Sequence, residues 1–173
     1  MKRLILMRHA KTEAWDHGME DAARVLLPRG QSDAGLIAAE LGRRGWIPDL
    51  VLISSARRTR ETWKHMAQTF PDAKTHVLDE LYLAGTQALE DAVSEHEHAG
   101  TLMLLGHNPG MHDFAGGISS RAGAKNQKAA LTLSAKMPTA ATALFEANSD
   151  SEFDASRLKL VDYIIAKGLR PPE

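Results

Sequence analysis

The sequence predicts a three-layer α/β/α sandwich whose sheet is mostly parallel. Short apolar segments that end at polar residues alternate along the chain with longer segments of helical period. Such apolar runs are typical of buried strands, and strands that alternate with helices form right-handed βαβ units around a parallel sheet. We expect one or two late strands to pair antiparallel at an edge of that sheet.

The first predicted strand, residues 4–7, ends abruptly at the polar pair Arg8 and His9. The polar stretch that follows, residues 13–24, is expected to form a surface loop. The strand therefore delivers a cation and an imidazole to the point where it gives way to a loop.

The first predicted helix opens within residues 27–33, with its start expected near Gln31 or Ser32. Apolar residues at helical spacing form a stripe along one face of it, namely Ala34, Ile37, Ala38 and Leu41. Glycines and arginines from Gly42 onward mark its end.

The later elements alternate in the same way. Strands are expected at residues 50–53, 75–78, 101–105, 139–146 and 157–165, and helices at residues 56–70, 86–98 and 111–117. The polar segment 119–136 has room for a short helix near 126–133, residues 147–155 are expected to form a turn, and residues 167–173 a proline-rich tail. The last strand alternates Leu158, Leu160 and Asp162 against Lys159, Val161 and Tyr163.

Length and composition fit one domain that spans residues 1–173. The 173 residues are 43% hydrophobic and 25% charged, which is ordinary for a globular protein. A net charge of -1 gives no electrostatic footprint for nucleic acid or an anionic membrane. The absence of cysteine excludes disulfides, thiolate nucleophiles and zinc–thiolate sites. No apolar run approaches the ~18 residues of a membrane span, so we expect a cytoplasmic protein.

Polar residues at or just after predicted strand ends form a candidate site, namely Arg8, His9, Arg58 and His107. In open α/β sheets, ligands bind outside the carboxyl ends of the strands. Guanidinium forks suit phosphate oxygens, and a dianionic phosphoryl group would offset the repulsion between these cations. The pattern predicts a phosphate site in which a neutral imidazole attacks phosphorus. No metal or cofactor is expected, because the arginines supply the positive charge.

A further pair of histidines, His96 and His98, lies near the end of the third predicted helix. Residues two apart on a helix do not share a face. A solvated surface is therefore favoured there over a metal site.

The segment 4–12 resembles the signature of the histidine phosphatase superfamily, which has the phosphoglycerate mutase-like fold. The usual Arg-His-Gly of that family is Arg-His-Ala here, with Ala10 in the third position. The Arg-His-Ala-Lys start with a following Trp15 is similar to the SixA branch, the phosphohistidine phosphatases. Residues 21–30 resemble the same branch, with Arg24, Leu26 and Gly30 in place.

Three later segments resemble further blocks of the same family. Residues 50–62 are similar to its second block, with Ser55 in place of a proline and Glu61 in place of a glutamine. Residues 104–110 resemble the block that holds the second histidine, and residues 137–141 the late strand motif. The resemblance runs from residue 4 to about residue 146.

The resemblance implies that His9 is the nucleophile and that Arg8, Arg58 and His107 form the phosphate pocket. Arg57 competes with Arg58 for this position, and the spacing to the neighbouring residues of the block favours Arg58.

Three further residues are assigned with alternatives. Glu80, just past the third strand, is either the proton donor or a loop carboxylate. Thr12 either donates a hydrogen bond to phosphate or orients His9, or it caps the end of a strand. Arg24 either touches the substrate at the rim of the pocket or forms a surface salt bridge.

The resemblance implies a metal-independent phosphatase with a phosphohistidine intermediate, acting most directly on phosphohistidine of a protein such as a phosphotransfer domain. Only 26 residues separate Glu80 from His107, which is enough for one helix. Mutases and small-molecule phosphatases of this family usually insert a helical lid there, so we expect an open site without a large lid. A small-molecule phosphomonoesterase with the same nucleophile and a non-catalytic phosphate-binding module stay as alternatives.

Overall fold

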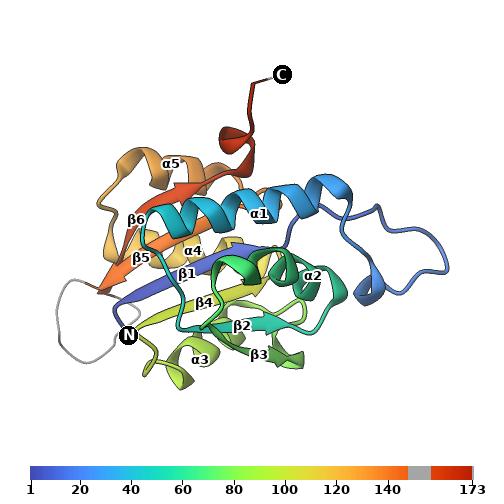
Figure 1. The fold of residues 1–173 in the computed structure, drawn as a ribbon. Helices are drawn as coiled ribbons and strands as arrows, with labels where there is room; N and C mark the ends of the chain where they lie inside the picture. Colours follow the sequence, from blue (N-terminus) through green and yellow to red (C-terminus); the bar gives the residue numbers. More distant parts are fainter. Residues whose placement is uncertain (148–156, 173) are drawn as a thin grey trace.

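The structure, a computed structural model that describes residues 1–147 and 157–172, contains a six-stranded mixed sheet with helices on both faces (Figure 1). The strands are β1 (Arg3–Arg8), β2 (Leu50–Ser54), β3 (Lys74–Leu78), β4 (Thr101–Gly106), β5 (Thr142–Ala147) and β6 (Leu158–Ile164). Their order across the sheet is β3-β2-β4-β1-β5-β6. This arrangement confirms the predicted α/β fold class.

The strands β3, β2, β4 and β1 run parallel to one another. Beyond β1, the strand β5 pairs antiparallel with β1, and β6 pairs antiparallel with β5 at the edge. The two expected antiparallel strands are therefore confirmed. Because β1 and β4 are in register, with Arg8 opposite Gly106, the residues that follow these two strands emerge side by side.

The helices are divided between the two faces of the sheet. On one face lie α1 (Pro28–Arg43) and α2 (Arg57–Met66), and on the other lie α3 (Thr86–Glu95), α4 (Gly110–Ala122) and α5 (Gln127–Ala135) (Figure 1). Short 3-10 turns occur at Asp21–Ala23, Ala67–Thr69, Asp79–Leu81 and Ala166–Leu169.

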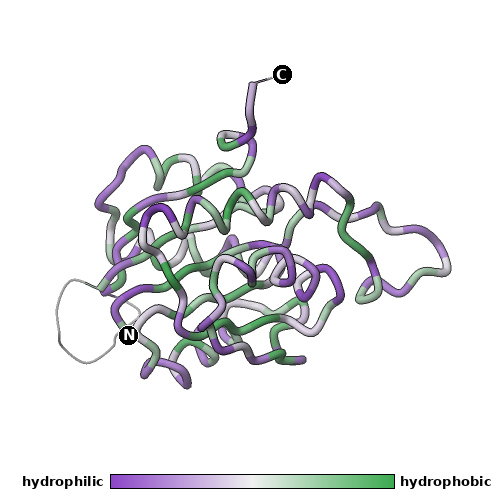
Figure 2. The backbone as a smooth tube through the Cα atoms, in the orientation of Figure 1, coloured by the Kyte–Doolittle hydropathy of each residue, from purple (hydrophilic) through white to green (hydrophobic). Residues whose placement is uncertain are grey.

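The strand β1 lies in the middle of the sheet and is buried on both faces. Ile5 and Met7 join the core beneath α1 and α2, whereas Leu4 and Leu6 join the core beneath the other helices. A continuous apolar run is what a strand covered on both faces requires. Figure 2 shows the strands in the middle of the sheet as largely hydrophobic.

Two helices differ in their bounds from the sequence expectation. The helix α1 begins at Pro28 rather than near Gln31, because the fixed φ and missing N–H of proline suit the first position of a helix. The helix α4 continues to Ala122, beyond the expected residue 117. Its later residues are mostly polar, but Ile118 is buried one turn after Phe114, and this contact holds the last turns against the core.

The alternation predicted for the last strand is broken by a β-bulge. Leu144 pairs with Asp162 and Phe145 with Leu160, so Val161 has no partner across the strand pair. One extra residue shifts the following side chains to the opposite face. Asp162 therefore lies on the α1 side, where it forms an ion pair with Arg44.

Between β3 and β4 the chain forms only a 3-10 turn and the helix α3, which confirms the absence of a large helical lid. The loop between β1 and α1, drawn in blue, projects from the body of the molecule (Figure 1). Residues 148–155, most of the predicted late turn, lie outside the described residues. Among the described residues, no helix is long and apolar enough to cross a membrane.

The contact between α1 and the chain after β1 can be tested at Gly30. A Cβ at this position would lie 2.1 Å from the carbonyl oxygen of Lys11, which accepts a hydrogen bond from the N–H of Leu27. Because backbone cannot yield easily, we expect Gly30→Ala to lower the free energy of unfolding by roughly 1–3 kcal/mol. Urea unfolding of the purified variant measures this loss.

Gly35 on the same helix is the matched control, because a Cβ there meets nothing within 4 Å. Gly35→Ala should raise stability by up to about 1 kcal/mol, the difference in helix propensity. Equal effects of the two substitutions would show that the close approach at Gly30 does not constrain the fold.

Candidate active site

The carboxyl ends of β1 and β4 bring two histidines together. His9 follows β1 and His107 follows β4, and their ring centroids lie 5.4 Å apart. Both side chains are buried. The parallel pairing of the two strands therefore produces the juxtaposition of imidazoles that the sequence predicts.

The contacts of His9 assign the protons on its ring. Its Nδ1 lies 2.8 Å from the carbonyl oxygen of Ala10. A carbonyl can only accept, so Nδ1 carries the proton and Nε2 keeps its lone pair. Burial has the largest effect and, together with the charges of His107, Arg58 and Arg8, lowers the pKa of His9 to about 3, although the contact with the carbonyl of Ala10 acts in the opposite direction. His9 is therefore neutral near pH 7 and able to act as a nucleophile.

The backbone around His9 is held from several directions. The N–H of His9 donates to the carbonyl of Gly106, and its own carbonyl accepts from the N–H of Ala140. The N–H of Ala10 donates to Oγ1 of Thr62 on α2 at 3.0 Å. This segment is thus fixed by β4, by the start of β5 and by α2, which restrains the orientation of the imidazole.

Arg58 enters the site from the first turn of α2 and is 2% exposed. Its guanidinium donates to the backbone oxygen of Asp21 at 2.8 Å and to Oδ2 of Asp21 at 3.0 Å. The hydroxyl of Tyr82 donates to the same Oδ2 at 2.7 Å. Asp21 thereby fixes the guanidinium plane and offsets part of its charge.

Asp21 is ionised near pH 7. Burial raises its pKa, but hydrogen bonds from Tyr82, Arg24 and Arg58 outweigh this effect and lower the pKa of Asp21 to about 2. A carboxylate that accepts several charged or polar hydrogen bonds is stabilised in its charged form. The loop between β1 and α1 therefore supplies a permanent negative charge behind the arginines.

Arg8 and His107 complete the candidate site, Arg8 as a cation and His107 as a neutral imidazole. The guanidinium of Arg8 donates to the backbone oxygen of Met137 at 3.0 Å, and burial lowers the pKa of Arg8. Nε2 of His107 lies 2.6 Å from Oγ of Ser54. Burial has the largest effect and, together with the charges of Arg58 and Arg8, lowers the pKa of His107 to about 4, although the charge of Asp21 acts in the opposite direction.

Three of these residues each have a buried nitrogen without a hydrogen-bond partner among the described residues. The atoms are Nε of Arg8, Nε of Arg58 and Nδ1 of His107. Buried polar groups are nearly always paired in folded proteins. Unpaired nitrogens on both guanidinium groups are therefore consistent with a site that binds an anion.

Thr12 and Arg24 also belong to this region. The guanidinium of Arg24 donates to Oγ1 of Thr12 at 2.7 Å and forms an ion pair with Asp21 at 3.0 Å. Together with Arg8 and His9 they line a cavity of about 340 Å³. Arg24 thus forms the expected salt bridge and also lines this cavity, and its contact with a substrate stays a prediction.

Two other candidates lie outside this group of contacts. Arg57 is largely exposed and pairs with Glu61 at 2.8 Å, so Arg58 is the arginine that points into the site. Glu80 is exposed in the turn Asp79–Leu81. Among the described residues it forms no hydrogen bond or ion pair, so the structure does not bring it into contact with the residues above.

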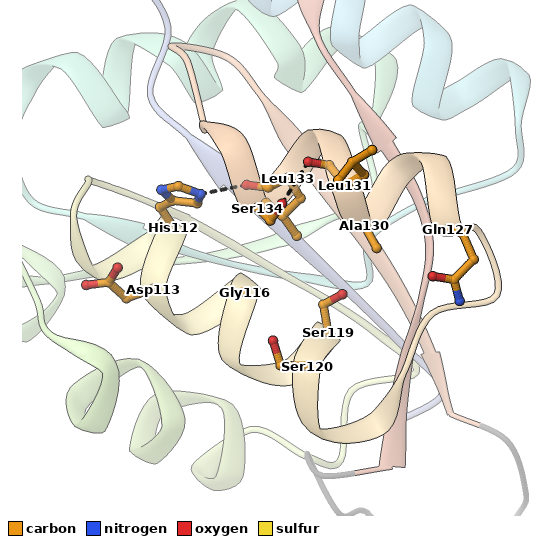
Figure 3. Close-up of a pocket in the computed structure, with 10 residues that line it drawn as sticks. All are labelled: His112, Asp113, Gly116, Ser119, Ser120, Gln127, Ala130, Leu131, Leu133 and Ser134. Atoms are coloured by element: carbon orange, nitrogen blue, oxygen red, sulfur yellow. Dashed lines mark hydrogen bonds between the residues drawn. The ribbon is translucent and has the colours of Figure 1, made fainter.

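A larger hollow, of about 570 Å³, lies elsewhere, between α4 and α5 (Figure 3). His112 is at its edge, with Nε2 2.6 Å from the carbonyl oxygen of Leu133. No residue of the candidate site lines this hollow.

Three histidines also gather at the outer edge of the sheet. The rings of His96 and His98 lie 6.0 Å apart, and His76 of β3 lies 5.8 Å from His96. The sequence pattern places His96 and His98 on one helix, where their side chains would point to different faces. That placement is wrong, because α3 ends at Glu95 and the chain turns before His98. Within residues 1–147 and 157–172, no group of three or more side chains is arranged to hold a metal ion.

A neutral imidazole with a free lone pair, set beside the buried Arg58 and the half-buried Arg8 at the carboxyl edge of parallel strands, is suited to take up a phosphoryl group. The fold and the site define an α/β phosphatase. Residues 4–143 match the model of the histidine phosphatase superfamily (branch 1), and the chain belongs to this family.

Two relatives are similar in sequence. The chain is 37% identical over 129 residues to an uncharacterised chloroplastic protein of Arabidopsis thaliana, a match that covers 68% of this chain and 59% of that protein. It is 33% identical over 139 residues to an uncharacterised protein of Mycobacterium tuberculosis, covering 80% of this chain and 85% of that protein. The chain thus matches little more than half the length of the Arabidopsis relative.

Solved structures of the SixA branch are similar in fold. The protein of Agrobacterium tumefaciens named as the phosphohistidine phosphatase SixA has a TM-score of 0.79 and 27% identity, and the match covers 95% of this chain and 97% of that one. A protein histidine phosphatase SixA complexed with tungstate has a TM-score of 0.74 and 18% identity, covering 97% and 99%. The SixA-type branch of the family is therefore supported.

Sequence reasoning missed the two residues that hold Arg58 in place. Asp21 lies in a loop 37 residues before Arg58, and Tyr82 follows the 3-10 turn after β3. Neither forms a motif by itself. The one available signal is that buried arginines need a carboxylate partner, which would direct a search to acidic residues of the loop after β1.

The buried, neutral histidines predict a pH dependence of stability. Unfolded imidazoles titrate near pH 6.5, whereas His9 and His107 titrate at about 3 and about 4 in the fold. Between these limits the unfolded chain binds more protons. The free energy of unfolding should therefore decrease as the pH falls from about 7 to about 4, by up to about 1.4 kcal/mol per pH unit for each histidine.

Urea unfolding at about pH 7 and about pH 5 measures this dependence. His9→Asn should remove about half of it, and His65→Asn, on an exposed residue of α2, is the matched control. A slope that does not change in His9→Asn would contradict the assignment of a neutral, buried His9.

Proposed function

We propose that this phosphatase is metal-independent and removes phosphate from phosphohistidine on a protein through a phosphohistidine intermediate on His9. The observation that carries the proposal is the neutral His9 ring, with Nδ1 bound to the carbonyl of Ala10 and Nε2 free. We further propose that residues 1–173 form a single domain and that the protein acts in the cytoplasm.

The reaction has two balanced steps. Nε2 of His9 attacks phosphorus, the bond from phosphorus to the substrate nitrogen breaks, and that nitrogen takes up a proton. Water then attacks the phosphorus on His9, inorganic phosphate leaves, and the neutral imidazole is restored. Arg8, Arg58 and His107 would stabilise the charge on the phosphoryl oxygens in both steps.

Two observations support a protein substrate. The segment between β3 and β4 holds a single helix, so a folded protein could bring a side chain to His9. A site that is not covered excludes water poorly, which harms a mutase but not a hydrolase. The similarity to the SixA protein of Agrobacterium tumefaciens, at 27% identity, points to the same substrate class.

The proposal predicts that the protein dephosphorylates a phosphohistidine-bearing phosphotransfer domain in the presence of a chelator. His9→Ala should slow the loss of phosphate at least about a thousandfold, because the nucleophile is removed. His65→Ala is the control for a histidine outside the site. Release of inorganic phosphate from the purified, phosphorylated domain gives the rates.

Each other result has a definite meaning. Loss of phosphate that persists in His9→Ala would make the assignment of the nucleophile wrong. Sensitivity to the chelator would contradict metal independence. An intact phosphotransfer domain together with rapid hydrolysis of small phosphate esters would favour a small-molecule phosphatase. Phosphopeptide binding without any turnover would favour a non-catalytic module.

We propose Glu80 as the proton donor, although it contacts no residue of the site in this structure. Catalytic hydrogen bonds are often long in a free enzyme and shorten once substrate binds. The oxygen of an alkyl ester would leave as a strongly basic alkoxide unless it received that proton, whereas the nitrogen of a phosphohistidine belongs to an imidazole, which is a much better leaving group. Glu80→Gln should therefore slow hydrolysis of an alkyl phosphate at least about tenfold and that of phosphohistidine less than about twofold.

Asp79→Asn is the matched control, because Asp79 is an exposed carboxylate of the same turn. Steady-state rates on both substrates measure the effect. If the two variants behave alike on both substrates, Glu80 is an ordinary loop carboxylate.

A further inference from the structure

A second hollow, of about 370 Å³, adjoins the cavity above His9. The two share Lys11 and Thr139 as lining residues. Lys11 follows His9 by two positions, and Thr139 precedes the residue whose N–H binds the carbonyl of His9. A ligand bound at His9 could therefore extend directly into this second hollow, which we call the basic groove.

Most of the charged residues that line the basic groove are cations, and Asp33 is the single acid among them. The cations are Lys11, Arg29, Lys136, Lys167 and Arg170. Asp33 is bound by the Arg170 guanidinium through two hydrogen bonds, of 2.9 and 2.7 Å. This pair is neutral as a whole. The groove therefore has a positive charge even though the whole chain has a net charge of -1.

The remaining cations are exposed, and the only acid among the lining residues is Asp33, whose pKa burial raises, although the nearby charge of Arg29 acts in the opposite direction. Lys11, Arg29, Lys136 and Lys167 form no ion pair within the part of the chain that the structure describes. Like charges that gather without ion pairs raise the free energy of the fold by mutual repulsion. An anion bound in the groove would remove that repulsion.

The cations come from separate parts of the chain. Lys11 follows β1, Lys136 follows α5, and Lys167 lies in the 3-10 turn after β6. Arg29 lies in the first turn of α1, where the helix dipole disfavours a cation. The fold thus gathers them beside the site, although the sequence shows no basic run.

We propose that the basic groove binds acidic side chains that flank the phosphorylated residue of a protein substrate. This inference rests on the proposed function and names a feature of its substrate. The phosphoryl group would occupy the arginine pocket around His9, and the flanking carboxylates would lie over Lys136 and Lys167.

The kind of cation favours a protein surface over the second phosphate of a small molecule. The proposed phosphate pocket uses the buried Arg58 and the half-buried Arg8, whose rigid forks fit one compact anion. Lysines are flexible, strongly hydrated point charges that suit carboxylates in variable positions. In the groove, Lys11, Lys136 and Lys167 are exposed, and Arg170 is already bound to Asp33. Such a surface fits a partner whose carboxylates are spread over several residues.

Two phosphohistidine peptides test the proposal, one with glutamates and one with glutamines beside the phosphohistidine. The wild-type protein should hydrolyse the acidic peptide with a KM about fivefold lower, since each exposed ion pair contributes little. Lys136→Gln with Lys167→Gln should abolish that preference. Hydrolysis of free phosphohistidine should stay unchanged, because neither lysine lines the cavity above His9.

The matched control is Lys74→Gln with Lys128→Gln, which removes two exposed lysines outside the groove. Preference lost only in the groove variant supports the proposal. Preference lost equally in the control would indicate general attraction and overturn it.

The other outcomes also decide between explanations. Equal KM values of the wild-type protein for the two peptides would overturn the inference and leave the proposed function intact. If the groove variant weakens hydrolysis of a small bisphosphate but not of the acidic peptide, the groove binds a second phosphate and the protein assignment is wrong. If the wild-type protein hydrolyses neither peptide nor free phosphohistidine, the proposed function fails and the inference with it.

Discussion

The parallel pairing of β1 with β4 is the contact on which the site depends. Two strands in register end at the same edge, so the residues after them, His9 and His107, become neighbours. Both strands are buried on their two faces and cannot slip by one residue without turning apolar side chains out of the cores. The energy that fixes the geometry of the candidate site therefore comes from the burial of the leucine, isoleucine and methionine side chains of these strands.

The arginines that gather at this edge of the sheet need polar partners, and the loop after β1 supplies one of them. Arg8 and Arg58 are both drawn out of water, and each would destabilise the fold if it had no polar partner. Asp21 supplies a charge for Arg58, and the carbonyl of Met137 supplies a partner for Arg8. After these bonds are made, the Nε atoms of both arginines still have no hydrogen-bond partner among the described residues.

Much of this could be predicted from the sequence because it depends on local pattern. Apolar runs that stop at polar residues locate Arg8, His9 and His107 at strand ends, and the resemblance of these segments to one family supports the same positions. The single helix between β3 and β4 follows from chain length alone.

What the sequence did not reveal depends on contacts between distant residues. Asp21 and Tyr82 meet Arg58 only after the chain has folded, and no spacing rule connects them. The bulge that moves Asp162 to the α1 side is set by pairing with β5 rather than by the alternation within β6. The basic groove is likewise invisible in the sequence, because its cations lie in separate segments.

The loop between β1 and α1 has two structural roles. Through Asp21 it holds the buried Arg58 of the candidate site, and through Arg24 it lines the cavity above His9. Loops are usually the parts of a fold that evolution alters freely when it changes a partner. Here a change of this lining also shifts the support of Arg58, so recognition and turnover cannot diverge independently. Family members that acquire new substrates should therefore conserve an acidic anchor while the residues around it vary.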